Sequence, residues 1–313
     1  MGFDLEGMLV IGISSSALFD LSISDSIFRE EGTVKYREHQ EANIDQHLPR
    51  GVAFPFIRRL LSLNNLSGTK PLVEVVVMSR NSPETGLRVM RSVAHYGLDI
   101  TRSIFTEGAS PYPYMPALNM SLFLSANEED VKHAVDSGFP AGQVLPCEAE
   151  EDASDPELRV AFDFDGVLAN DESERVYKEE GLDGYLRYEA QHSHEPLDPG
   201  PLSPLLQAIN RIQRIEETAF AEDQSYVKRV QVSLVTSRGA PTHERAVETL
   251  QHWGTTVNGA FFLGGLDKNK ILDILNPHIF FDDQRAHVDL SARSVPSVHV
   301  PFGVRNHEDV PPQ

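Results

Sequence analysis

The sequence has almost no cysteine and far fewer basic than acidic residues. Of its 313 residues only Cys147 is a cysteine, which excludes an internal disulfide. The 27 lysines and arginines stand against 47 acidic residues and give a formal net charge of −20. A surface this acidic is a poor match to nucleic acid or to an anionic membrane, so neither is expected as a partner. An anionic ligand would need local cations or a metal ion to overcome the overall charge.

Long hydrophobic runs are also missing. No stretch approaches the ~18 apolar residues of a membrane-spanning helix, and the first residues lack the pattern of a secretory signal peptide. We therefore expect a cytoplasmic protein without a membrane partner. A chain of 313 residues is long enough for one large or two ordinary domains with ample core.

The most informative stretch is a short apolar run that ends in two acidic residues. It covers residues 160–168 and places Asp163 and Asp165 one residue apart, just before Gly166. Such a run is typical of a buried parallel strand, and ligands bind beyond the carboxyl ends of such strands. In an extended chain both carboxylates can face one ligand, and they repel each other unless a cation or a shared proton intervenes. The alternative is a strand end with two solvated aspartates.

The second half of the sequence repeats the first at slowly changing offsets. The offset is 149 residues near the start of each copy and 158 or 157 further on. Matched pairs, in order, are Tyr36 with Tyr185, Gly51 with Gly200, Ser79-Arg80 with Ser237-Arg238, Val89 with Val247, Gly97 with Gly254 and Phe123 with Phe280. The unit is too long for a solenoid, so an internal duplication into two similar α/β lobes is the natural interpretation.

The two copies differ at the polar residues that could perform chemistry. The residues of the second copy and their counterparts are Asp163 and Ser14, Asp165 and Ser16, Thr236 and Met78, Lys268 and Pro111, and Asp282-Asp283 and Ser125-Ala126. Scaffold residues match while these groups occur in the second copy alone. The sequence therefore predicts one lobe equipped for catalysis and one that has lost it.

We predict an α/β fold in which each lobe is a Rossmann-like parallel sheet with helices. The boundaries are a degenerate lobe at 1–146, an acidic linker at 147–157 and a catalytic lobe at 158–313. A helical insert at about 171–223 is expected to form a small cap that keeps bulk water from the site. The clearest strands are expected at 8–13, 72–78, 121–124, 160–162, 230–235 and 279–281, and the clearest helices at 24–40, 51–63 and 83–96.

Besides the strand end of Asp163 and Asp165, two more predicted strand ends of the second copy carry groups suited to a phosphate and a metal ion. After residues 230–235 come Thr236, Ser237 and Arg238, a hydroxyl and a turn whose backbone N–H groups can bind an anion. Lys268 adds a compact positive charge, and residues 279–281 end in Asp282-Asp283. Hard oxygen ligands beside a phosphate favour Mg²⁺, and an aspartate can attack phosphorus. Each element also has an ordinary explanation as a helix cap, a solvated lysine or a polar strand end.

This order of motifs resembles the haloacid dehalogenase superfamily of phosphatases. Longer stretches resemble the cytosolic 5'-nucleotidase I family over almost the whole chain. They are SRNSPETGLR at 79–88, HYGLDI at 95–100, DESERV at 171–176, PHIFFDDQ at 277–284 and HVPFGV at 299–304. The resemblance implies Mg²⁺-dependent hydrolysis of nucleoside 5'-monophosphates such as AMP, through an aspartyl-phosphate intermediate.

The resemblance also implies roles for individual residues. Asp163 would be the nucleophile, and Asp165 the acid that protonates the leaving ribose oxygen and then activates water. Thr236 and Lys268 would hold the phosphoryl oxygens. The implied metal ligands are Asp282 and Asp283, with a carboxylate oxygen of Asp163 and the backbone carbonyl of Asp165. Predicted substrate contacts are Ser237 and Arg238 and, in the corresponding turn of the first copy, Arg80 and Asn81.

Two other functions stay open at this point. The same machinery could act on another phosphomonoester such as a sugar phosphate, or the chain could be a nucleotide-binding sensor that has lost catalysis. A metal-dependent phosphate-release assay would separate the sensor from the enzymes. Tyr112, Tyr114, Phe139 and Trp253 could stack a base but are more often core residues. The sequence does not determine the preferred base or whether the chain forms a homo-oligomer.

Overall fold

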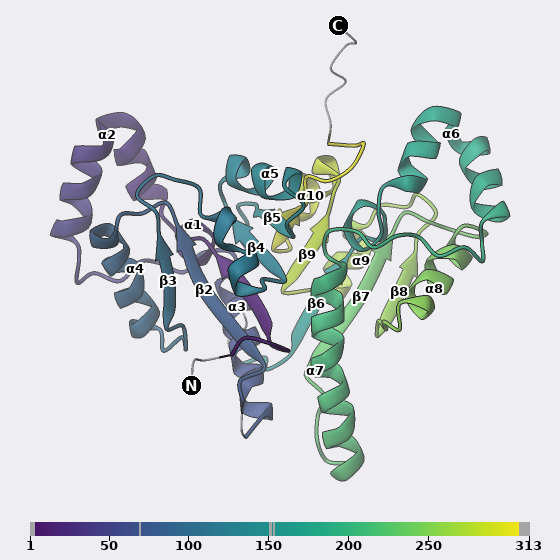
Figure 1. Ribbon diagram of the computed structural model, residues 1–313, viewed down its shortest axis with the longest axis horizontal. Helices are drawn as coiled ribbons and strands as arrows, with labels where there is room; N and C mark the ends of the chain where they lie inside the picture. The colour runs from purple at the N-terminus through teal and green to yellow at the C-terminus, as the bar shows by residue number, and fades with distance from the viewer. Residues whose placement is uncertain (1–3, 69, 150–151, 153, 307–313) are drawn as a thin grey trace, which may run out of the picture.

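The computed structural model describes residues 4–68, 70–149, 152 and 154–306 (Figure 1). Its ten strands form one sheet in the order β3-β2-β1-β4-β5-β10-β9-β6-β7-β8. The strands are β1 (Leu9–Ile13), β2 (Val73–Ser79), β3 (Arg102–Phe105), β4 (Leu122–Ser125), β5 (Ala141–Val144), β6 (Leu158–Phe162), β7 (Val230–Thr236), β8 (Gly259–Phe262), β9 (Ile279–Asp282) and β10 (Ser297–His299). The helices are α1 (Ser15–Leu18), α2 (Ser22–Ala42), α3 (Phe54–Ser62), α4 (Pro83–His95), α5 (Glu128–Asp136), α6 (Glu172–Gln191), α7 (Ser203–Glu222), α8 (His243–His252), α9 (Asn269–Leu275) and α10 (Arg285–Ser291).

The sheet consists of two halves with the same strand order. In the first half the order is β3-β2-β1-β4-β5, and in the second half it is β8-β7-β6-β9-β10. Every pairing inside a half is parallel, whereas β5 and β10 pair antiparallel and join the halves edge to edge. The sheet therefore runs without interruption through both predicted lobes. Figure 1 shows α2 and α6 far apart, at corresponding places on the two halves.

Details of backbone and hydrogen bonding recur at the predicted offsets. Gly32 in α2 and Gly181 in α6, 149 residues apart, interrupt their helices with φ of 83° and 69°. The backbone N–H of Leu48 donates to Ser92 Oγ at 2.9 Å, and that of Leu197 to Thr249 Oγ1 at 3.1 Å. Ser92 and Thr249 are 157 residues apart. The offset between α4 and α8 is therefore 157, one residue less than the 158 expected from the pairing of Val89 with Val247.

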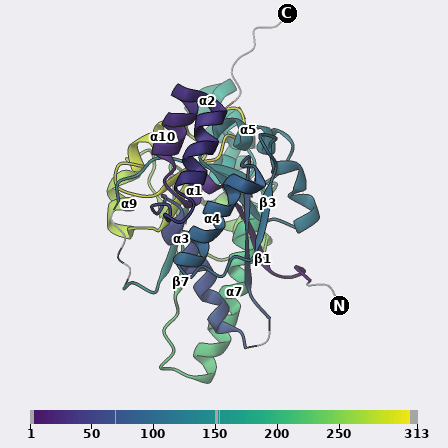
Figure 2. The same cartoon turned by 90° about the vertical axis from the view of Figure 1, so that its left-hand side faces the viewer.

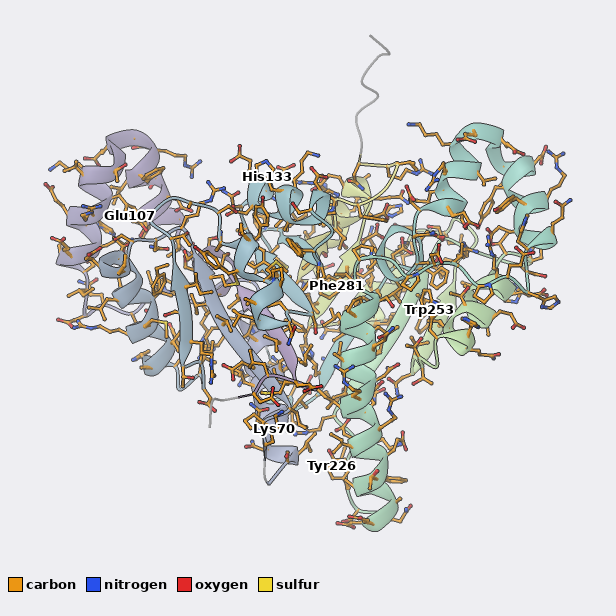
Figure 3. All side chains as sticks on the ribbon, in the orientation of Figure 1. Lys70, Glu107, His133, Tyr226, Trp253 and Phe281 are labelled. Atoms are coloured by element: carbon orange, nitrogen blue, oxygen red, sulfur yellow. The ribbon has the colours of Figure 1, made fainter. Side chains whose placement is uncertain are left out.

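The apolar core lies against the middle of the sheet. Phe162 at the end of β6 stacks on Phe281 of β9 with ring centroids 5.2 Å apart, and Figure 3 shows Phe281 near the centre of the molecule. The long β-branched and aromatic runs fold into β1, β2, β4, β6, β7 and β9, close to their predicted bounds. The strands β3, β5, β8 and β10 were not predicted. They have three or four residues each and include glycine or polar residues, so their hydrophobic pattern is too short to identify.

The predicted cap at 171–223 contains two helices with different positions. The kinked α6 stands above the second half in Figure 1, whereas α7 runs along the sheet and reaches past its lower end. In Figure 2 this lower end of α7 again lies at the opposite end of the molecule from α2. Leu205, Leu206 and Ile209 of α7 are buried in the main core, which makes α7 a sheet-covering helix. The range expected as one cap thus contains α6, which stands above the second half, and α7, which covers the sheet.

The predicted linker at 147–157 lies partly outside the described residues. Of its described residues, Asp152 accepts a hydrogen bond at its backbone carbonyl from Arg59 Nη2 at 2.7 Å. Asp155 lies 2.7 Å from Arg159 Nη1 at the start of β6. Among the residues described, no helix combines the length and the apolar character that crossing a membrane requires.

Gly200 provides a test of the packing between the chain after α6 and the loop after β6. A Cβ at this position would lie 2.3 Å from the backbone oxygen of Ala169, which cannot move away as a side chain could. We expect Gly200→Ala to lower the free energy of unfolding by about 2 kcal/mol, measured by urea denaturation. The matched control is Gly68→Ala, where a Cβ meets no atom within 4 Å. Equal stabilities of the two variants would contradict the prediction.

Candidate active site

The candidate site lies where three neighbouring parallel strands of the second half end. β6 pairs with β9 on one side and β7 on the other. Asp163 directly follows β6, Thr236 is the last residue of β7, and Asp282 is the last residue of β9. Because these strands point the same way, their last residues meet at one edge of the sheet. All three side chains are buried, as are Asp283 and Lys268.

Lys268 joins two of the buried acids. It caps the start of α9, and its Nζ lies 2.6 Å from Asp163 Oδ2 and 2.7 Å from Asp282 Oδ2. Burial raises the pKa of Asp163 to about 6, although Lys268 opposes the shift. Burial also acts on Asp282, but Lys268 and His287 outweigh it and lower its pKa to about 2. Lys268 thus favours the charged form of both aspartates, and His287 adds to this effect at Asp282.

Arg238 holds the second acid of the motif and has no donor left for a substrate. Its Nε and Nη2 donate to the two carboxylate oxygens of Asp165 at 2.8 and 2.7 Å. Its remaining N–H groups bond Glu189 and Ser173 of α6 and the backbone oxygen of Thr242. A guanidinium has five N–H donors, and all five are used here. Arg238, predicted as a substrate contact, therefore positions Asp165 and ties it to α6.

Among the described residues, neither carboxylate oxygen of the buried Asp283 has a hydrogen-bond partner. It lies against the turn after Asp165, where a Cβ on Gly166 would come within 2.7 Å of its carboxylate. Gly166 has φ of 70°, so both space and backbone conformation favour glycine there. Burial, followed by the nearby charge of Glu174, raises the pKa of Asp283 well above its ordinary value.

Glu174 of α6 is a site residue that the sequence analysis missed. Burial raises the pKa of Glu174 to about 7, with Asp165 and Asp163 as the next causes. Its Oε2 is buried and has no hydrogen-bond partner in the part of the chain that the structure describes, while Oε1 accepts from Gln284 Nε2 at 3.1 Å. Glu174 lies in the stretch 171–176 that carried the family resemblance, but no strand end or spacing linked it to Asp283.

These acids fit a hard divalent cation. Neighbouring buried carboxylates with oxygens that receive no hydrogen bond, both in Asp283 and one in Glu174, are costly unless a cation or protons satisfy them. Asp163, Asp283 and Glu174 offer only oxygen atoms, the ligands that Mg²⁺ prefers. Asp282 already accepts from Lys268 and from the backbone of Gln284, and Asp163 likewise accepts from Lys268 and from the backbone of Phe164. Both aspartates therefore have fewer lone pairs left for a cation than Asp283. Ligand atoms of Asp163, Asp282 and His287 do lie within 4.8 Å of one another, but the ammonium of Lys268 is bonded to both of the aspartates.

The remaining predicted residues fall in different places. Thr236 Oγ1 accepts the backbone N–H of Arg238 at 3.2 Å, beside the acids, and Ser237 is exposed on the same turn. Arg80 and Asn81 do not join this site. They line a cavity in the first half, where Arg80 pairs with Asp130 at 2.6 Å. The predicted contact of these two residues with the substrate at Asp163 is therefore not supported by the structure.

An aromatic pair on α6 stands beside the acids. The rings of Tyr177 and Tyr185 meet edge to face with centroids 6.0 Å apart. Burial raises the pKa of Tyr185 to about 12, and Arg238 and Asp165 are its charged neighbours. Arg305 lies over the ring of Tyr177 at 5.5 Å, and its Nε is 3.5 Å from Glu174. Neither tyrosine was among the aromatic residues considered for a base.

The aromatic residues considered from the sequence have other surroundings. Trp253, labelled in Figure 3, stacks on Phe164 with centroids 6.4 Å apart and packs against the main core. Tyr112 packs against Phe139 in the first half, and Tyr114 is exposed. The internal repeat paired Tyr36 with Tyr185, and this was the one observation from the sequence that involved either tyrosine of α6.

The Lys268 pairing can be tested through stability. In Lys268→Met, Asp163 and Asp282 lose their common cation while they stay buried. We expect the free energy of unfolding, measured in urea at pH 8 with chelator, to fall by about 3 kcal/mol. Lys132→Met is the control, because Lys132 and Asp136 form an exposed pair at 3.3 Å whose loss should cost less than about 0.5 kcal/mol. A similar small loss for both variants would show that Lys268 does not offset the buried acids.

The fold and the site together define an α/β protein in which buried carboxylates, a lysine and a threonine converge at the ends of parallel strands. The family model of 5'-nucleotidase matches residues 1–307, and the chain belongs to the 5'-nucleotidase family. It is 35% identical over 294 residues to the human (Homo sapiens) protein named cytosolic 5'-nucleotidase 1B. That match covers 92% of this chain and 48% of the human protein, so the chain spans about half the length of this relative.

Proposed function

We propose that this protein is a Mg²⁺-dependent 5'-nucleotidase that hydrolyses nucleoside 5'-monophosphates to nucleoside and phosphate. The observation that carries the proposal is the grouping of Asp163, Lys268 and the unpartnered Asp283 at one sheet edge, in a member of the 5'-nucleotidase family. The name of the human relative supports the same activity and a cytosolic location.

The reaction proceeds in two displacements at phosphorus. Asp163 attacks the phosphorus, the bond to the ribose O5' breaks, and an aspartyl phosphate forms. A carboxyl group with a pKa of about 6 is mostly ionised at neutral pH, so Asp163 is available as a nucleophile. Water then attacks the phosphoryl group and releases phosphate and free Asp163. Lys268 offsets negative charge at Asp163, and the Thr236 hydroxyl can donate to a phosphoryl oxygen.

Asp165 handles the protons of both steps. It donates a proton to the leaving O5' and later accepts one from the attacking water. In the structure its two carboxylate oxygens each accept a hydrogen bond from Arg238. Asp165 therefore has to leave this pairing before either oxygen can transfer a proton to the leaving group or from the water. Since Arg238 is also bonded to Glu189 of α6, a shift of α6 on substrate binding would release it.

Asp163, Asp283 and Glu174 would hold the Mg²⁺, together with the backbone carbonyl of Asp165. The bound cation supplies positive charge to the phosphoryl oxygens and reduces their repulsion from the acids. The support is the two unpartnered oxygens of Asp283 and the raised pKa of Asp283 and Glu174 in the protein without metal.

The finer structural predictions belong to the same proposal. The matched strand orders and the recurring contacts support an internal duplication of a haloacid-dehalogenase-like unit. The position of α6, with Glu174, Tyr177 and Tyr185 beside the acids, supports a cap role for this helix. The exposed ring of Tyr177 favours a substrate with a base over a sugar phosphate, because a base can stack on it. The complete set of acids argues against a sensor that has lost catalysis.

Asp163→Asn tests the nucleophile. The amide keeps the size of the side chain and removes the attacking charge, so we expect turnover of AMP to fall by about a thousandfold or more. Phosphate release at saturating Mg²⁺ is the measurement. The control Asp183→Asn changes an exposed acid of α6 and should keep full turnover. Near wild-type turnover in Asp163→Asn would disprove the assignment.

Asp283→Asn tests the metal site through stability rather than activity. Without metal, the variant loses a buried charge that has no partner, so its Tm in chelator should rise by about 3 °C. The rise in Tm that Mg²⁺ gives to the wild-type protein should be largely lost. Asp289→Asn, at an exposed acid paired with Arg285 at 2.8 Å, should keep that rise. A full Mg²⁺-dependent rise in Asp283→Asn would exclude Asp283 as a ligand.

A further inference from the structure

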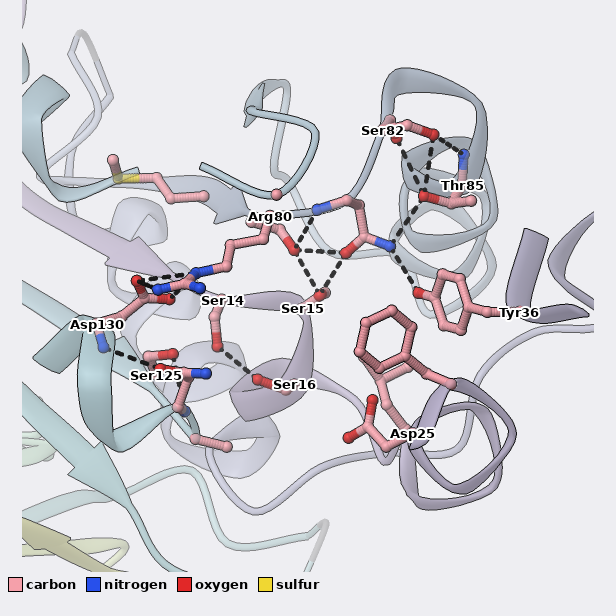
Figure 4. Close-up of a pocket in the computed structure, with 18 of the residues that line it drawn as sticks. Ser14, Ser15, Ser16, Asp25, Tyr36, Arg80, Ser82, Thr85, Ser125 and Asp130 are labelled. Carbon is pink, nitrogen blue, oxygen red and sulfur yellow. Dashed lines mark hydrogen bonds and ion pairs between the residues drawn. The ribbon is translucent and has the colours of Figure 1, made fainter. Parts of the chain in front are cut away.

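The first half contains a cavity of about 930 Å³ that the proposed catalysis does not use. It is lined by the ends of β1, β2 and β4 and by α2 (Figure 4). Ser14 follows β1 as Asp163 follows β6, and Ser125 ends β4 as Asp282 ends β9. The cavity therefore occupies the place in the first half that the acid–lysine site occupies in the second.

Acidic residues outnumber basic residues around the cavity. Arg80 is taken by Asp130, to which it donates three hydrogen bonds of 2.6 to 3.0 Å. Arg37 lies 3.6 Å from Glu107, and Arg29 Nε donates to the backbone oxygen of Asp25. The lining has four acids, Asp25, Glu107, Glu128 and Asp130, against these three arginines. A phosphate dianion would add to a negative excess, so the cavity favours an uncharged ligand.

The floor of the cavity consists of hydroxyl groups. Ser14 Oγ and Ser16 Oγ are 3.0 Å apart, and their mutual hydrogen bond uses only one of the two hydroxyl hydrogens. Ser125 Oγ accepts the backbone N–H of Asn127 at 3.1 Å, and its own hydrogen can still donate. These groups can exchange hydrogen bonds with the hydroxyls of a sugar. They replace the acids of the second half, so repulsion no longer requires a metal.

The wall of the cavity has the same aromatic pair as the candidate active site. Phe28 and Tyr36 of α2 meet edge to face with centroids 5.8 Å apart, as Tyr177 and Tyr185 of α6 do at 6.0 Å. The repeat offset of 149 residues relates Phe28 to Tyr177 and Tyr36 to Tyr185. The ring of Phe28 is 50% exposed and lines the cavity, so a base can stack on it. The first half thus keeps the aromatic part of the site and loses the phosphate part.

We propose that this cavity binds an intact nucleoside, with its base on Phe28 and its ribose hydroxyls on Ser14, Ser16 and Ser125. The ligand belongs to the same chemical class as the nucleoside product of the proposed function. This choice of ligand class is the only part of the proposal that rests on the proposed function. The cavity is a second, non-catalytic site, since it lacks the nucleophile, the lysine and the paired acids.

The test is calorimetric titration of the full chain with adenosine, guanosine, cytidine and uridine, in chelator. We expect at least one nucleoside to bind, and Phe28→Ala to weaken it by about tenfold or more, because a stacked base is lost. Phe28 is exposed, so its replacement should leave the fold intact. Tyr177→Ala is the matched control on α6 and should change this affinity by less than about twofold. AMP in chelator should bind more weakly than adenosine.

Three results would overturn the proposal. They are the absence of binding by all four nucleosides, a loss of binding in Tyr177→Ala but not in Phe28→Ala, and tighter binding of AMP than of adenosine at the Phe28 site. Phosphate release from AMP with Mg²⁺ is measured separately. If that reaction failed while nucleoside binding depended on Phe28, the proposed function would be wrong and the cavity assignment would stand.

Discussion

The structure of the second half depends on the contact of one lysine with two buried aspartates. Lys268 bonds Asp163 and Asp282, while Asp283 and Glu174 lie nearby with oxygens that have no donor. A single ammonium cannot offset four buried carboxylates, so burial, followed by repulsion among these acids, raises the pKa values of Asp163, Asp283 and Glu174. The buried negative charge therefore favours the binding of a cation at this site.

The first half has the same scaffold without the buried acids and the lysine. Its strand order is that of the second half, and Ser92 accepts from Leu48 as Thr249 accepts from Leu197. Serines replace the acids at the strand ends, so a hydroxyl floor forms without a compensating lysine or metal. The scaffold contacts are independent of the charges at the site. A shared fold can therefore hold two binding sites of different chemistry.

The helix α6 is linked to the chemistry through buried ion pairs. Glu189 bonds Arg238 and Arg245, and Arg238 bonds Asp165. Because these groups are buried, separating any one of them leaves an uncompensated charge, which couples the position of α6 to the state of Asp165. In the first half Gln40 takes the place of Glu189 and bonds Arg88, and Arg80 turns to Asp130 instead. The corresponding helix α2 therefore bonds Arg88 through the neutral Gln40 rather than through an acid.

The sequence by itself determined the long strands, the repeat and the acids at strand ends, because hydrophobic runs and matched offsets are local patterns. It identified Asp163, Lys268 and the Asp282-Asp283 pair for the same reason. Only the tertiary structure showed that β5 and β10 join the halves, because pairing of short strands depends on contacts far apart in the chain. It alone assigned Arg238 to Asp165, brought Glu174 beside Asp283 and placed Arg80 in a separate cavity. Those outcomes depend on which side chains meet across α6 and the sheet, and residue spacing does not encode them.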